Sequence, residues 1–202
     1  MKLQGTYQFT DRVAHDALVV TLDEMKAHLR IEQSFTEDDN YIQALILAAM
    51  DLVEQMTWRY LNQNTIQFNC EIWPDESIIY LCRGVAYQIE SVKYIDSFGI
   101  QNTMSTGVDY NFDISNEIGR IKLLNRPELN KDILNAVEVI YTTRWNQFDT
   151  ENIIPEAVKS AIKLMCGHWY ENRQDVITGT ITSELPKTSE YILTPYKIRI
   201  FA

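Results

Sequence analysis

The chain has 202 residues, of which 46% are hydrophobic, and only 7 Gly and 5 Pro, so it can form one or two compact units with a substantial core. This composition excludes an intrinsically disordered or low-complexity protein. Its formal net charge is −10, without any cluster of Lys and Arg, which argues against a free-standing nucleic-acid binder, because neutralised phosphates supply most of such a protein's affinity.

Two helices are expected in the first third of the chain. Residues 1–20 predict an N-terminal arm of uncertain structure. Thr21 and Glu24 form a capping-box pattern, which predicts a short helix to about Arg30. Thr36, followed by three carboxylates, is expected to cap a second helix of about five turns. The apolar residues of this helix recur at spacings of three and four, typical of a face that packs in a core: Ile42, Leu45, Ile46, Ala49, Leu52, Val53 and Met56.

From about residue 64 to 145 the hydrophobic period changes towards two, which indicates strands. The clearest candidates are residues 110–114, 120–123 and 136–142, with a turn at 116–119 between the first two. Weaker alternation marks residues 66–72, 77–81 and 89–95. This block predicts a small antiparallel β unit inserted between helices.

A third long helix is expected to begin at Pro155, which the first turn tolerates, and to end near Asn172. Its apolar face would consist of Val158, Ala161, Ile162, Leu164, Met165 and Trp169. Residues 183–193 predict a short last helix that Pro195 ends. The order predicts an α+β fold in which about four helices form a bundle. We expect an arm at 1–20, a helical body at 21–62 and 150–194, a β-rich unit at 63–149 and a strand-like tail at 195–202.

The sequence shows no credible active site. It lacks the common nucleophile, phosphate-loop, dinucleotide and zinc-protease motifs, and its three His residues are scattered. Cys166 and His168 are two apart on a predicted helix and therefore point in different directions, which argues against a metal site. We expect three free, largely buried cysteines in a reducing compartment. No apolar stretch approaches the length of a membrane span, and no signal peptide is recognisable. We therefore predict a non-enzymatic, unexported protein without catalytic residues, metal or cofactor.

Residues 167–173 combine two large aromatic side chains with a guanidinium group at a helix end. Trp169, Tyr170 and Arg173 are of the types that dominate protein–protein hot spots, which makes them candidate subunit-interface residues. An explanation within one chain is equally open, with Trp169 in the core and Arg173 pairing with Glu171 or capping the helix.

The last residues are patterned as a strand. Tyr196, Ile198 and Ile200 would lie on one side, and Lys197 and Arg199 on the other. A strand at the end of a chain either pairs with its own sheet or adds to the sheet edge of another protein. Both alternatives remain open from the sequence.

The chain resembles the head-tail connector (adaptor) proteins of long-tailed bacteriophages. The stretches that carry the resemblance are residues 20–31 (VTLDEMKAHLRI), 44–54, 154–159 (IPEAVK), 168–173 (HWYENR), 184–186 (ELP) and 195–196. Residues 1–18 have no counterpart in the family, and Trp58-Arg59-Tyr60 departs from the family's usual small-residue turn.

The resemblance implies a ring, usually of twelve subunits, docked beneath the portal protein in the neck of a virion assembled in the bacterial host cytoplasm. DNA would pass through its channel without sequence-specific binding, and a stopper or tail protein would bind below. The family's C-terminal segment reaches into the portal. The expected portal-binding residues are therefore Tyr196, Lys197, Ile198, Arg199, Ile200 and Phe201.

Two other functions are kept as alternatives. An accessory DNA-packaging protein would need a basic groove or metal-binding carboxylates. Another neck component, such as a stopper or tail terminator, would be expected to consist mainly of β structure, whereas this chain has helical periodicity near both ends.

Overall fold

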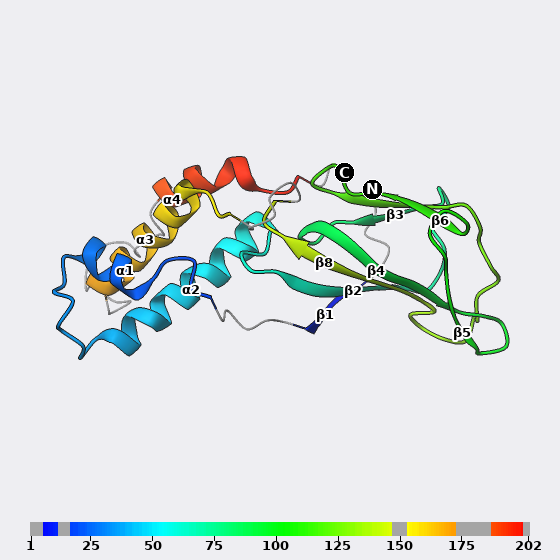
Figure 1. Ribbon diagram of the computed structural model, residues 1–202, viewed down its shortest axis with the longest axis horizontal. Coiled ribbons are helices and arrows are strands. Elements are labelled where there is room, and N and C mark those ends of the chain that lie inside the picture. Colours follow the sequence, from blue (N-terminus) through cyan, green and yellow to red (C-terminus); the bar gives the residue numbers. More distant parts are fainter. Residues whose placement is uncertain (1–5, 12–16, 147–152, 173–186, 200–202) are drawn as a thin grey trace, which may run out of the picture. The chain divides into compact units, whose positions relative to one another are not determined.

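The computed structural model describes residues 6–11, 17–146, 153–172 and 187–199. The chain divides into two compact units (Figure 1). The first, here called the β unit, comprises Met1–Ala14, Asn62–Ile153 and Ile198–Ala202. The second, the helical unit, comprises His15–Leu61 and Ile154–Lys197. Each unit is therefore built from segments that are far apart in the sequence.

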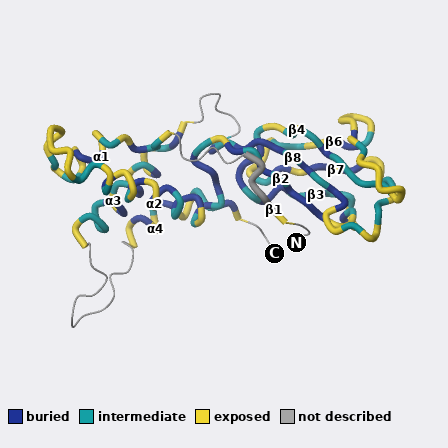
Figure 2. The backbone as a smooth tube through the Cα atoms, turned by 90° about the horizontal axis from the view of Figure 1, so that it is seen from below, coloured by how far each residue is buried: buried dark blue, intermediate teal, exposed yellow. Residues whose placement is uncertain are grey.

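The described part of the helical unit contains α1 (Leu22–Leu29), α2 (Asp39–Thr57), α3 (Glu156–Glu171) and α4 (Lys187–Leu193), followed by the 3-10 helix η1 (Thr194–Tyr196). Helix α3 packs against α2 and α4, and α1 contacts both α2 and α3. The apolar face of α2 is buried at three- and four-residue spacings, as the sequence predicts. Figure 2 shows that buried positions concentrate in the helices and strands, whereas the loops are mostly exposed.

One of the two predicted helix N-caps, that of α1, is present in the structure, and that of α2 is not. The predicted capping box is present: Glu24 N–H donates to Thr21 Oγ1 at 3.2 Å, and Thr21 N–H donates to Glu24 Oε2 at 3.0 Å. The predicted cap of α2 is wrong, because the N-cap is Asp38 and not Thr36. The Asp39 N–H donates to the Thr36 carbonyl at 3.2 Å, so Thr36 opens a turn that precedes the helix.

The buried face of α3 differs from the prediction at three positions. Val158, Ala161, Ile162 and Met165 are buried as expected. Leu164 is exposed and Trp169 is half-buried, whereas Cys166 is fully buried. Cys166 therefore belongs to the buried face, and Leu164 does not.

Two antiparallel sheets form the β unit. One has the strand order β1-β2-β8-β4-β5 and the other has the order β3-β7-β6. The strands are β1 (Thr6–Asp11), β2 (Asn64–Cys70), β3 (Ile78–Leu81), β4 (Val85–Ile95), β5 (Gln101–Thr103), β6 (Tyr110–Asp113), β7 (Gly119–Leu123) and β8 (Val137–Arg144). Strand β7 alternates strictly between buried and exposed side chains. Gly119 lies against β4 and β3, where a Cβ atom would come within 3.0 Å of Ala86 Cβ.

The structure adds detail to the predicted β unit. The N-terminal arm, for which the sequence assigned no structure, contains the strand β1, whose Thr6 pairs with Asn69 of β2. In β6, Tyr110 is buried, whereas Phe112 two residues later is 44% exposed. The antiparallel β unit consists of two sheets. The described residues thus form a mixed α and β fold with four α-helices and two antiparallel sheets.

The predicted C-terminal strand also needs correction at its start. Tyr196 ends the 3-10 helix η1, because the Lys197 N–H donates to the Thr194 carbonyl. Lys197 has an extended backbone, and Ile198 is buried. Ile200 and Phe201 lie outside the described residues, as do Arg173 and the predicted start of the last helix at residue 183.

Candidate connector surfaces

Tyr170, at the C-terminal end of α3, has partners within the helical unit. Its hydroxyl donates to Asp38 Oδ2 at 2.5 Å, and its ring lies 6.1 Å from the ring of Tyr41. Trp169 is half-buried. The structure therefore ties the end of α3 to the N-cap of α2 and brings Tyr170 together with Asp38 and Tyr41.

The root of the C-terminal tail is held by Arg59. The Arg59 side chain is buried, and its Nε donates to the Tyr196 carbonyl at 2.7 Å. Among the expected portal-binding residues, Tyr196 and Lys197 are half-buried, Ile198 is buried and Arg199 is exposed. Of these four residues, only Arg199 is largely open to a partner.

A second buried cation, Lys26 of α1, organises the connection between α1 and α2. Its Nζ lies 2.5 Å from Asp39 Oδ1 and donates to the carbonyls of Phe35 and Gln33 at 2.7 and 3.2 Å. Sequence reasoning missed both Lys26 and Arg59. The one available signal was the unusual Trp58-Arg59-Tyr60 string, which departs from a small-residue turn.

The thiols are suited to packing. Cys70, Cys82 and Cys166 are free and buried, as predicted. Burial raises the pKa of Cys70 and of Cys166 to about 12, which keeps both protonated at neutral pH. In the described ranges, no group of three or more His, Cys, Asp or Glu side chains could hold a metal ion.

The β unit contains a cavity with a largely polar lining. Its lining includes Gln67, Lys93 and Glu138. The Gln67 amide donates to Glu138 Oε2 at 2.9 Å, and Lys93 Nζ lies 3.5 Å from Glu138 Oε1. These three side chains satisfy one another, and their charges offset. The cavity therefore presents a self-paired polar surface and not a reactive group.

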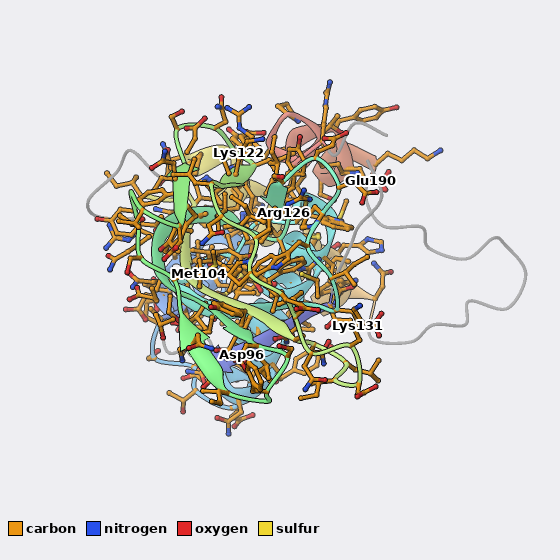
Figure 3. All side chains as sticks on the ribbon, turned by 90° about the vertical axis from the view of Figure 1, so that its right-hand side faces the viewer. Asp96, Met104, Lys122, Arg126, Lys131 and Glu190 are labelled. Carbon is orange, nitrogen blue, oxygen red and sulfur yellow. The ribbon has the colours of Figure 1, made fainter. Side chains whose placement is uncertain are left out.

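The described basic side chains of the β unit do not form one cluster, and some of them donate hydrogen bonds to backbone carbonyls. Figure 3 shows Lys122 and Lys131 at well-separated places on this unit. Lys122 Nζ donates to the Glu76 carbonyl at 3.1 Å, and Arg126 donates to the Pro74 carbonyl at 3.5 Å. This arrangement differs from the continuous basic groove that tight DNA binding needs. None of the described helices is both long and apolar enough to cross a bilayer.

Comparison with known proteins gives the fold a context. The family model described as "Phage gp6-like head-tail connector protein" matches residues 19–113, which include α1, α2 and strands β2 to β6. The predicted resemblance to head-tail connector proteins is confirmed. The matched part begins just before the capping box and continues into the β unit, so it includes segments of both units.

Solved structures of similar fold come from particle necks. A chain in the neck of an empty gene transfer agent particle, computed with C6 symmetry, is 17% identical with a TM-score of 0.72. A chain of the native gene transfer agent virion is 16% identical with a TM-score of 0.74, and one in the native neck, computed with C12 symmetry, is 16% identical with a TM-score of 0.70. Each match covers 97% of this chain and 97% of the other. No curated protein matches the chain significantly.

The family match and the shared fold agree with the function expected from the sequence. They support a structural role as a connector in the neck of a virion.

Proposed function

We propose that this chain is a ring subunit of a phage head-tail connector, docked beneath the portal and joining the DNA-filled capsid to the tail. The observation that carries the proposal is the connector family match over residues 19–113, combined with a neck-protein fold over nearly the whole chain. Necks that contain a chain of similar fold were computed with C6 and with C12 symmetry, and the C12 case supports a ring of about twelve copies. A stopper or tail protein would bind its other face.

In this proposal the helices form a four-helix bundle that is the body of the ring, and Trp169, Tyr170 and Arg173 contribute to contacts between subunits. A helical unit whose buried stripes are already covered within one chain can serve as a rigid building block.

The C-terminal residues Tyr196 to Phe201 are proposed to bind the portal. A strand of four to six residues adds a few backbone hydrogen bonds at about 1 kcal/mol each, which is too little for firm docking by one copy. Many copies on one ring convert this weak contact into strong avidity. Ile198 is buried in the isolated chain, so the part offered to the portal is expected to begin at Arg199.

The acidic composition suits a DNA conduit. About twelve copies with a net charge of −10 each would carry a formal charge of about −120, which repels DNA and keeps it from adhering during packaging and ejection. An accessory DNA-packaging role is the alternative, and tight, salt-sensitive binding in a gel shift at low salt would favour it.

The experiment that tests this proposal is portal capture by a chain that ends at Ile198. This truncation keeps the buried Ile198 and the Arg59–Tyr196 hydrogen bond, and removes only the residues expected to be offered. The full chain should form rings on isolated portals in electron micrographs, and the truncated chain should lose them. A chain lacking residues 1–5, which precede β1, is the matched terminal control and should bind normally.

If the chain ending at Ile198 binds portals and restores infectivity as well as the full chain does, the assignment of the tail is wrong. If electron micrographs place a labelled subunit away from the portal, on the tail side of the neck, the chain is a stopper and not the connector.

A further inference from the structure

The turn that follows α2 is held by hydrogen bonds from the backbone N–H groups of Trp58, Arg59 and Leu61. The backbone of Trp58 has a φ of 60°, in the left-handed region, and its N–H donates to the Glu54 carbonyl at 2.9 Å. The Arg59 N–H donates to Thr57 Oγ1 at 3.3 Å, and the Leu61 N–H donates to Glu54 Oε1 at 2.9 Å. Thr57 and Glu54 are themselves buried. The turn therefore holds Arg59 in one position.

In this position Arg59 forms a hydrogen bond to Tyr196, which lies 137 residues later in the sequence. Its Nε donates to the Tyr196 carbonyl at 2.7 Å, and the Arg59 side chain is only 8% exposed. A buried guanidinium group is costly unless it is hydrogen-bonded, and a charged donor makes a stronger bond to a carbonyl than a neutral one does. The hydrogen bond from Nε therefore links the buried Arg59 side chain directly to the backbone at the base of the tail.

The segment on the other side of this bond is equally well defined up to Lys197. Thr194 Oγ1 donates to the Glu190 carbonyl at 2.8 Å, and Pro195 lies in the first turn of η1. Leu193 and Ser189 on α4 are buried. The chain then becomes extended at Lys197. Arg59 therefore binds the backbone at Tyr196, directly before the chain becomes extended at the end of the helical unit.

We propose that Arg59 is the positioning residue of the C-terminal segment: its buried guanidinium group holds the Tyr196 carbonyl and fixes where the portal-binding residues begin. This inference rests on the proposed function of the tail. A segment of fixed origin has fewer conformations to lose on binding, so it binds more tightly than one on a loose root. The Trp58-Arg59-Tyr60 string, unusual for the resembled family, thereby acquires a role.

The test measures the tail and the portal contact separately. In the full chain without portal, backbone amide exchange of residues 194–199 is compared between wild type, Arg59→Met and Arg59→Lys. Arg59→Met keeps an apolar stem but removes every donor, and should accelerate exchange at least about tenfold. Arg59→Lys keeps the charge without the fixed Nε geometry and should give an intermediate rate. Lys159→Met, which removes a half-buried cation that pairs with the exposed Glu156 in the same unit, should leave exchange unchanged.

Portal capture by the same variants gives the second readout. Arg59→Met should weaken capture, and it should have no further effect in a chain that ends at Ile198, because that chain has no tail to position. Unchanged exchange at residues 194–199 in both Arg59 variants overturns the positioning role, even if thermal stability falls. If the Arg59 variants exchange faster at residues 194–199 but capture portals as well as wild type does, Arg59 positions the segment, and the proposed portal-binding role of the tail is wrong. If Arg59→Met does not fold, the Arg59→Lys comparison decides.

Discussion

The Lys26 ammonium group lies 2.5 Å from the Asp39 carboxylate, and the lysine side chain is only 2% exposed. The same Nζ donates to the carbonyls of Phe35 and Gln33, so one cation organises the whole connection between α1 and α2. Helices α1 and α2 both lie within residues 19–113, the part of the chain that the connector family model matches.

Replacing Lys26 by Met should destabilise the helical unit by about 3 kcal/mol. The substitution leaves two carbonyls and a partly buried carboxylate without their donor, and breaking a buried ion pair is costly for that reason. Urea unfolding followed by circular dichroism at 222 nm measures the change. Lys163→Met is the control: Lys163 lies 4.0 Å from the more exposed Glu24 and should cost less than about 0.5 kcal/mol. If both variants lose the same free energy of unfolding, the buried contacts of Lys26 do not stabilise the connection between α1 and α2.

Tyr170→Phe should destabilise the isolated chain by about 1.5 kcal/mol. The change removes the hydroxyl that donates to Asp38 but keeps the ring next to Tyr41, and a hydrogen bond to a charged acceptor contributes about this amount. Thermal unfolding of the monomer gives the measurement, with Tyr191→Phe at a 76% exposed position as the control. A stable monomer that nevertheless fails to form rings would show that the hydroxyl serves the subunit interface instead.

Local patterns predicted most of the elements. The capping box of Thr21 and Glu24 and the apolar period of α2 depend on residues within one or two turns, and both are present as expected. Strand β7 alternates cleanly because one side of it faces the core and the other does not. The cap of α2 was misplaced by two residues, since a turn begun by Thr36 and a helix begun by Asp38 share the same acidic sequence.

The missed features are non-local. Strand β1 pairs with β2 across more than fifty residues, and β5 is a three-residue polar segment that only its hairpin with β4 makes a strand. The Arg59 bond to Tyr196 ends on a backbone carbonyl, which every residue supplies, so no sequence spacing could indicate it. Lys26 is missed for the same reason, because two of its three partners are carbonyls.

Cys70 and Cys166 should resist alkylation in the folded protein. Their pKa of about 12, raised by burial from 9.0, lowers the thiolate fraction at pH 8 about a thousandfold. The folded state holds these protons more tightly than the unfolded state, so stability should fall as pH rises above about 9. Iodoacetamide labelling with peptide mapping tests the reactivity. Ser97→Cys, at an exposed position, is the reference thiol; native Cys70 reacting as fast as this reference would contradict its burial.

Asp96 should control the order of the hairpin between β4 and β5. Its Oδ1 accepts from the N–H groups of Ile100 and Phe98 at 3.0 Å each, and its Oδ2 accepts from the Asn102 amide at 2.9 Å. These bonds, the Ile100 N–H first, lower the pKa of Asp96 below its usual 3.8, so the hairpin should stay ordered at neutral pH and loosen only as pH falls through that lowered value.

Asp96→Ala should therefore raise amide exchange at Phe98 and Ile100 about tenfold or more at neutral pH while leaving β8 protected, because only the turn loses its acceptors. Phe98 is 87% exposed, so its protection depends on these bonds and not on burial. Asp75→Ala removes another exposed carboxylate of the β unit and serves as the control. Equal exchange at Phe98 in wild type and in Asp96→Ala would mean that backbone pairing alone, through Asp96 N–H and the Ile100 carbonyl, holds the turn.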